Sequence, residues 1–167
     1  MKSRNSSIAV MLALAAVSAL NARTAQAAVY HFELQGLNTA ADASGNVIAI
    51  NGQGNFDTTQ GTVKASGSYM VDDSTGAVTS RGTWVATDFV SFEPGGGVNN
   101  GFQTGLLDID ITLRPKGGVP ITSVSMSVFC EPGEAPGPAD VDSGDGTTVG
   151  GFTVDAHGFT LFQLIHP

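Results

Sequence analysis

The sequence predicts a single all-β domain, an antiparallel meander of about eight or nine strands, with a small β-barrel favoured over a β-sandwich. First, short alternating segments recur between Gly-, Pro- and Asp-rich turns, and no segment has a convincing helical period. Second, a glycine, a small polar residue and an aromatic residue recur at strand-like intervals, as Gly54-Asn55-Phe56, Gly67-Ser68-Tyr69 and Gly82-Thr83-Trp84. Third, the alternation shifts after Trp84, which predicts a bulge near Thr87 and Asp88, and bulges help a sheet to curl.

Residues 1–27 predict a secretory signal peptide that is removed. Lys2 and Arg4 precede an apolar run at residues 8–20, and Ala25-Gln26-Ala27 supplies the small residues that a signal peptidase requires. The apolar run is too short to span a bilayer comfortably, although an uncut membrane anchor is the alternative. We therefore expect one folded domain at residues 28–167, secreted or periplasmic and free of the membrane after cleavage.

The domain from residue 28 onward is strongly acidic. It keeps four of the seven Lys and Arg residues and all fifteen Asp and Glu residues, so its formal net charge is −11. Such a surface repels phosphate backbones and disfavours adsorption to anionic lipid, which argues against nucleic-acid binding. Cys130 is the only cysteine, so no internal disulfide can form. We expect it to be a small buried hydrophobe, with a reactive thiol or an intermolecular bridge as the alternative.

The N-terminal part of the domain predicts two short strands joined by a loop. Residues 29–34 alternate, with Tyr30, Phe32 and Leu34 on the face expected to meet the core. Residues 35–45 are rich in Gly, Asn, Ala, Ser and Asp, which predicts a loop. Residues 46–50 form the second short strand.

The meander that follows carries the aromatic residues. Glycine within a strand weakens it unless a close neighbour requires the space. Here each glycine precedes, by two residues on the same face, the ring of Phe56, Tyr69 or Trp84. We expect a ring from a neighbouring strand to lie over each bare backbone, as core packing. The alternative is a pocket for a small apolar molecule lined by the same three rings.

The C-terminal half predicts further strands between glycine- and proline-rich connections. Residues 93–104 contain three consecutive glycines but lack P-loop spacing, so we expect a plain loop, with a flap over a pocket as the alternative. The expected strands are residues 106–113 and 121–130, then a hairpin of residues 148–155 and 159–165 that turns at 156–158.

An acidic segment after the strand expected at residues 121–130 is the best metal candidate. Glu134, Asp140, Asp142 and Asp145 offer hard oxygen ligands of the kind that calcium uses. The third aspartate stands where an EF-hand loop needs glycine, so the spacing departs from that motif. A solvated acidic loop is the alternative, and calcium is the one cofactor that the sequence suggests.

The sequence offers no convergent set of catalytic residues. No serine stands in a nucleophile-elbow pattern, and no two histidines have metal-ligand spacing on one element. Asp108 and Asp110 share one solvated face, where nothing is expected to raise the pKa of either carboxyl group. These absences favour a protein that is not an enzyme.

Three functions follow as hypotheses. The first is a non-enzymatic exported domain that binds an extracellular partner or has a structural role. The glycine-punctuated meander is similar to those of the allene oxide cyclase and dirigent barrels, although no diagnostic motif is shared. The second hypothesis is a barrel that binds a small apolar molecule and has isomerase or cyclase activity, with Phe56, Tyr69 and Trp84 as walls and residues 93–104 as a lid. The third is calcium-dependent adhesion.

Overall fold

The computed structural model describes residues 28–99, 101–130 and 145–166, and every regular element in them is a strand. The eight strands are β1 (Val29–Ala41), β2 (Val47–Asp57), β3 (Thr62–Asp72), β4 (Val78–Asn99), β5 (Phe102–Pro115), β6 (Ile121–Cys130), β7 (Gly146–Val149) and β8 (Val154–His166). The predicted all-β class and strand number are confirmed. Within these residues, nothing forms a helix long and apolar enough to cross a membrane.

All eight strands belong to one antiparallel sheet that closes partly into a ring. Its order is β4-β3-β2-β1-β8-β5-β6-β7, and β4 also pairs with β5. The strands β1 to β6 pair consecutively, and β8 returns to pair along β1. A single residue pair, Phe102 with Gln163, joins β8 to β5 and completes the ring. The barrel prediction is therefore met by a sheet that is closed at one end of β5.

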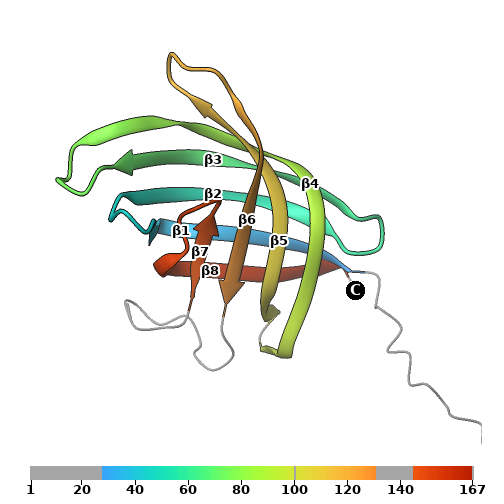
Figure 1. Cartoon of the computed structure of the whole chain (residues 1–167). Coiled ribbons are helices and arrows are strands. Elements are labelled where there is room, and N and C mark those ends of the chain that lie inside the picture. The colour runs from blue at the N-terminus through green and yellow to red at the C-terminus, as the bar shows by residue number, and fades with distance from the viewer. Residues whose placement is uncertain (1–27, 100, 131–144, 167) are drawn as a thin grey trace, which may run out of the picture.

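The sheet folds over itself so that its two halves cross (Figure 1). The strands β1, β2, β3 and β8 run across the view, whereas β5, β6 and β7 pass over them at a steep angle. The long strand β4 bends from one half into the other, pairing first with β3 and then with β5. Its register shifts between Ala86 and Asp88 and again between Phe89 and Ser91, which confirms the predicted bulge. The core lies between the crossing halves.

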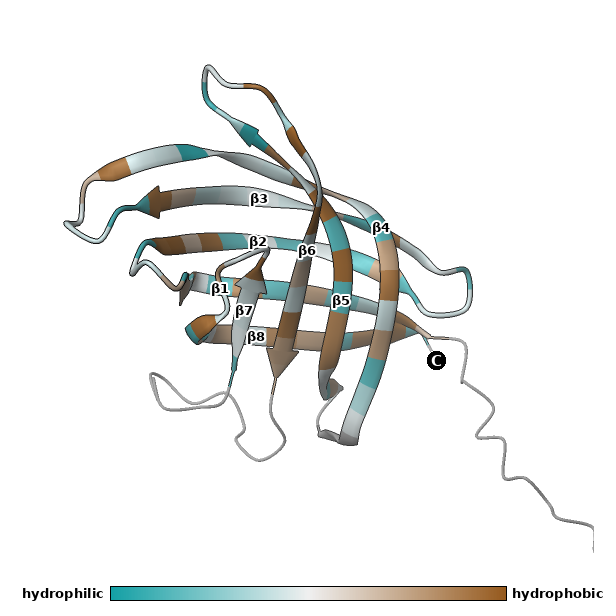
Figure 2. Cartoon of the chain, viewed as in Figure 1, coloured by the Kyte–Doolittle hydropathy of each residue, from teal (hydrophilic) through white to brown (hydrophobic). Residues whose placement is uncertain are grey.

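The core is built by the inner faces of the alternating strands. Figure 2 shows hydrophobic and hydrophilic residues following one another in bands along β4 and β5. Tyr30, Phe32 and Leu34 of β1 are buried, as predicted. The other large, fully buried side chains are Trp84, Phe56, Phe162, Ile48, Ile50, Leu107, Ile109, Ile111, Met126, Val128 and Val149.

The Trp84 indole explains two of the strand glycines. A Cβ on Gly67 would lie 2.6 Å from Trp84 Nε1 and would overlap the Asn51 carbonyl oxygen. A Cβ on Gly52 would overlap the same indole. Glycine is therefore needed where the ring lies against the backbone of β2 and β3, as the sequence predicted for Gly67. At Gly54 and Gly82 the prediction of an overlying ring was wrong, because the obstacle there is the neighbouring strand itself, at Ala65 and Arg114.

The prediction of one loop at residues 35–45 was wrong. β1 continues to Ala41 after a register shift between Leu34 and Asn38, and only a short turn precedes β2. The Asn38 side chain is buried, where its Nδ2 donates to the Phe159 carbonyl oxygen (3.3 Å). A buried hydrogen bond thus holds polar residues in a strand that their composition would assign to a loop.

Two further predicted connections are strands in the structure. Residues 93–99 and 102–104 belong to the hairpin of β4 and β5, in which Pro94 pairs with Gly105 and Asn99 with Phe102. The predicted C-terminal hairpin was also wrong, because β7 pairs with β6 and the predicted turn at 156–158 lies inside β8. Gly158 resembles a turn residue in the sequence, yet its Cβ would overlap the Asn38 side chain. Close packing requires glycine there.

Candidate functional site

The three predicted ligand-binding aromatics all belong to the hydrophobic core, but their rings do not pair with one another in the described residues. Trp84 is fully buried and donates its Nε1 hydrogen to the Asn51 carbonyl oxygen (2.9 Å). The Tyr69 hydroxyl lies 3.4 Å from Ser80 Oγ. Phe56 belongs to a separate group of rings, with Tyr30, Phe32, Phe89, Phe92 and Phe162 at centroid distances of 4.9–6.2 Å. In the described chain no ring pair links Phe56, Tyr69 and Trp84.

Of the predicted calcium ligands, only Asp145 can be located. Glu134, Asp140 and Asp142 lie outside the described residues. The Asp145 side chain is buried, and its Oδ2 accepts a hydrogen bond from the Thr160 backbone N–H (3.4 Å). No group of three or more His, Cys, Asp or Glu side chains suited to a metal occurs in residues 28–99, 101–130 and 145–166. The calcium site stays a prediction.

A buried polar cluster surrounds Asp145 where β1, β6, β7 and β8 meet. Thr147 Oγ1 donates to Asn38 Oδ1 (3.3 Å), and Thr160 Oγ1 donates to the Phe129 carbonyl oxygen (2.6 Å). Burial, followed by the nearby Asp145 carboxylate, raises the pKa of the Cys130 thiol to about 12. Because thiolates rather than thiols are nucleophiles, this shift disfavours a reactive thiol, and the half-buried Cys130 has no tested role.

The other candidate acid–base groups also have structural partners. Asp108 accepts hydrogen bonds from Ser127 Oγ (2.6 Å) and Ser91 Oγ (3.0 Å), which tie β5 to both of its neighbours. His157 Nδ1 donates to the Asp155 carbonyl oxygen (2.8 Å), so its Nε2 accepts from Thr39 Oγ1 (2.9 Å).

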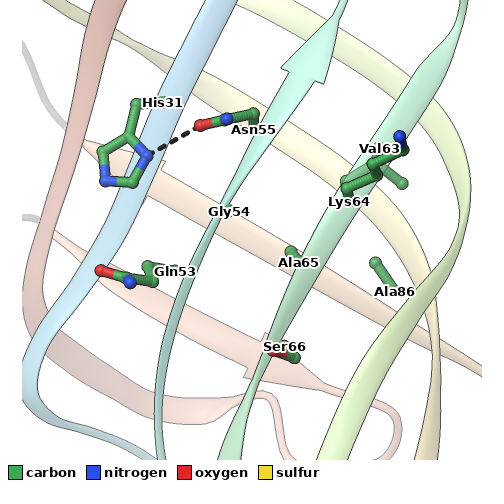
Figure 3. Close-up of a pocket in the computed structure, with 9 residues that line it drawn as sticks. All are labelled: His31, Gln53, Gly54, Asn55, Val63, Lys64, Ala65, Ser66 and Ala86. Atoms are coloured by element: carbon green, nitrogen blue, oxygen red, sulfur yellow. Dashed lines mark hydrogen bonds between the residues drawn. The ribbon is translucent and has the colours of Figure 1, made fainter.

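A shallow hollow is lined by residues of β1, β2, β3 and β4 (Figure 3). Its volume is about 520 Å³, and we call it the polar hollow. Its lining residues are His31, Gln53, Gly54, Asn55, Val63, Lys64, Ala65, Ser66 and Ala86. His31 Nδ1 donates to Asn55 Oδ1 (2.8 Å), since an amide oxygen can only accept. The Nε2 atom of the neutral ring is then left as an acceptor.

The sheet register brings these polar side chains together. His31 pairs with Asn55, which pairs with Lys64, so that three neighbouring strands contribute one row. Gln53 pairs with Ser66 in the next row. Side chains alternate between the faces of a strand, so all five project away from the core. Sequence reasoning missed this site, although the polar half of each alternating strand was its signal.

A second hollow lies on the outer face of β3, β4 and the end of β5. Its volume is about 540 Å³, and we call it the basic hollow because three bases line it. Its lining residues are Ser68, Tyr69, Met70, Arg81, Gly82, Thr83, Arg114 and Lys116. Of the three predicted pocket aromatics, Tyr69 alone lines either hollow. The two hollows follow one another along β3, through Lys64, Ser66, Ser68 and Met70.

Comparison with known proteins gives no assignment: no family model matches the chain, and no curated protein or solved structure is significantly similar to it. Function must therefore be inferred from the chemistry and geometry of the chain's own residues.

Proposed function

We propose that the protein is an exported, non-catalytic binding domain whose ligand lies on the outer face of the sheet, in the polar hollow. One observation carries the proposal. Gln53, Lys64 and Ser66 converge there, and the side chains of all three make no hydrogen bond within the described chain. Such groups are available to a ligand, whereas the buried side chains of Asn38 and Thr160 make their hydrogen bonds within the protein.

The close packing around Phe56 and Trp84 supports the choice of the outer face. Phe56 and Trp84 are fully buried, and the Trp84 indole lies against the backbone at Gly52 and Gly67. An apolar ligand between these rings would have to displace close-packed side chains. Both hollows described above open on the outer surface instead, so the barrel with an internal apolar ligand is the less supported function.

The chemistry of the polar hollow favours a neutral, hydroxyl-rich ligand such as an oligosaccharide. Lys64 and the Asn55 amide donate, His31 Nε2 accepts, and Gln53 and Ser66 do both. Hydroxyl groups also both donate and accept hydrogen bonds, so they match a row of side chains that contains donors and acceptors. Neighbouring strands lie about 4.8 Å apart, and alternate residues along a strand about 6.6–6.8 Å apart, which suits an extended chain of polar groups.

Export is supported by residues 1–27, which lie outside the described residues but have the three-part pattern of a signal peptide. Intact-mass analysis of the exported protein tests this part of the proposal. We expect a mature chain that begins at Ala28. A chain that retains residues 8–20 would contradict cleavage and favour a membrane anchor.

Binding is tested by calorimetric titration of the mature protein with malto-, cello-, xylo- and chito-hexaose. We expect one of these neutral oligosaccharides to bind, and Gln53→Ala or Lys64→Ala to weaken it by about tenfold, the loss of one good hydrogen bond. Gln60→Ala, which removes an exposed amide in the β2–β3 turn, is the matched control and should leave the affinity unchanged. Binding that is equally strong in all variants would refute this site.

A further inference from the structure

The basic hollow gathers most of the positive charge of an acidic protein. From residue 28 onward the sequence contains four Lys and Arg residues, and Arg81, Arg114 and Lys116 all line this hollow. The fourth base, Lys64, lies in the polar hollow. The side chains of the three bases in the basic hollow are all exposed.

The strand register makes the three bases neighbours. The Lys116 backbone N–H donates to the Arg81 carbonyl oxygen (2.8 Å), which places these two residues side by side on β4 and the end of β5. Arg114 pairs with Thr83, so it is the diagonal neighbour of Arg81. Diagonal neighbours on one face of a sheet lie about 7–8 Å apart, within reach of long side chains. The backbone thus holds the bases in place before any ligand arrives.

Nothing in the described chain neutralises these charges. None of the three side chains makes an ion pair or a hydrogen bond there. Like charges on neighbouring strands destabilise a sheet, and a chain with fifteen acids had ample means to place one opposite them. A bound anion would remove the repulsion, so the uncompensated cluster is understandable as a site that a ligand completes.

We propose that the basic hollow binds an oxyanion: the phosphate, sulfate or carboxylate group of a small ligand. The planar guanidinium of arginine matches all three groups, with two parallel hydrogen bonds to a carboxylate or phosphate. Charges are screened beyond about 8 Å at physiological ionic strength, so the hollow attracts an anion locally although the whole protein is negative. A long polyanion would extend over the acidic remainder of the surface and be repelled there, so a small ligand is favoured. Met70 lines the same hollow and offers apolar contact to an organic ligand.

The test is a series of thermal melts of the mature protein at constant ionic strength, with chloride replaced stepwise by phosphate, sulfate or acetate. We expect at least one oxyanion to raise the Tm in a saturating manner, half-complete at roughly 1 mM, because an anion that binds the folded state stabilises it. Arg114→Gln should weaken this response about tenfold, by removing charge-assisted hydrogen bonds. Lys64→Gln removes one positive charge outside the basic hollow, so this variant should keep the full response of the Tm to the oxyanion.

Phosphate and sulfate also stabilise proteins generally, because they are excluded from the surface, but that effect rises without saturation. A rise that does not saturate, or one equal in wild type and Arg114→Gln, would overturn the proposal. Lys116→Gln serves as a second variant if Arg114→Gln unfolds. Comparing the phosphate, sulfate and acetate arms identifies which oxyanion is preferred. Gln53→Ala should retain the oxyanion response, so this site and the oligosaccharide site can fail separately.

Discussion

The two faces of β3 differ in what determines their residues. On the inner face, Gly67 and Tyr69 are fixed by neighbours, because the Trp84 indole leaves no space for a side chain at residue 67. On the outer face, Lys64 and Ser66 make no side-chain hydrogen bond within the described chain. The inner face thus specifies the fold, whereas the outer face is free to be specified by a ligand. Substitutions on the two faces should therefore separate stability from binding.

The largest expected effect is that of Trp84→Ala. Removing a fully buried tryptophan from a close-packed core lowers the free energy of unfolding by about 3–5 kcal/mol. Urea denaturation of the mature protein measures the change. A loss below about 1 kcal/mol, the size expected of a tolerated surface change, would mean that the interior is not filled.

Gly67→Ala should cost about 1–3 kcal/mol of stability, as overpacking does, because its Cβ would meet both the Asn51 carbonyl and the indole. The matched control is Gly151→Ala, whose added Cβ would have no neighbour within 4 Å. Urea denaturation of both variants should show a loss of stability in Gly67→Ala alone. Equal losses would place the indole away from β3.

The next effect concerns the polar part of the interior, and it depends on pH. The folded state holds the pKa of Cys130 at about 12, above its ordinary value of 9.0. Above pH 9 the unfolded chain therefore loses this proton first, so the thiol's contribution is complete below pH 9 and declines as the pH rises towards 12. Wild type should lose stability more steeply over this window than Cys130→Ala. If the stabilities of wild type and Cys130→Ala declined equally with pH, the thiol would not be shielded by burial.

The smallest expected effect on stability comes from the outer face. Gln53→Ala removes an exposed side chain without a hydrogen-bonding partner in the described chain, so stability should change by less than about 0.5 kcal/mol. The same variant is expected to lose oligosaccharide binding, as calorimetry would show. A large loss of stability with unchanged binding would reverse the roles of the two faces.

The inner face could be predicted because it repeats every second residue. Tyr30, Phe32 and Leu34 follow that period and are buried, and the shift after Trp84 marked a real bulge. The extension of β1 could not be predicted, because Gly36 and Asn38 belong to residue types that favour turns. Pairing with β2 and β8, together with the hydrogen bond from Asn38 to the Phe159 carbonyl oxygen, holds that segment in the sheet.

The outer sites could not be predicted, because their residues are distant in sequence. Arg81 and Arg114 are separated by a complete hairpin, and only the pairing of β4 with β5 brings them together. His31 and Lys64 are joined in the same way, through Asn55 of β2. Alternation reveals which face a residue takes, but it carries no information about which residue of another strand lies beside it.

The most direct test of ligand binding on the outer face is a backbone-amide and indole NMR titration of the mature protein with the oligosaccharide selected by calorimetry. We predict that the amide signals of Gln53, Asn55 and Ser66 shift with ligand, while the indole N–H signal of Trp84 stays in place, because that proton is buried against Asn51. A shift of the Trp84 indole with unchanged signals on the outer face would place the ligand inside the sheet and contradict the account.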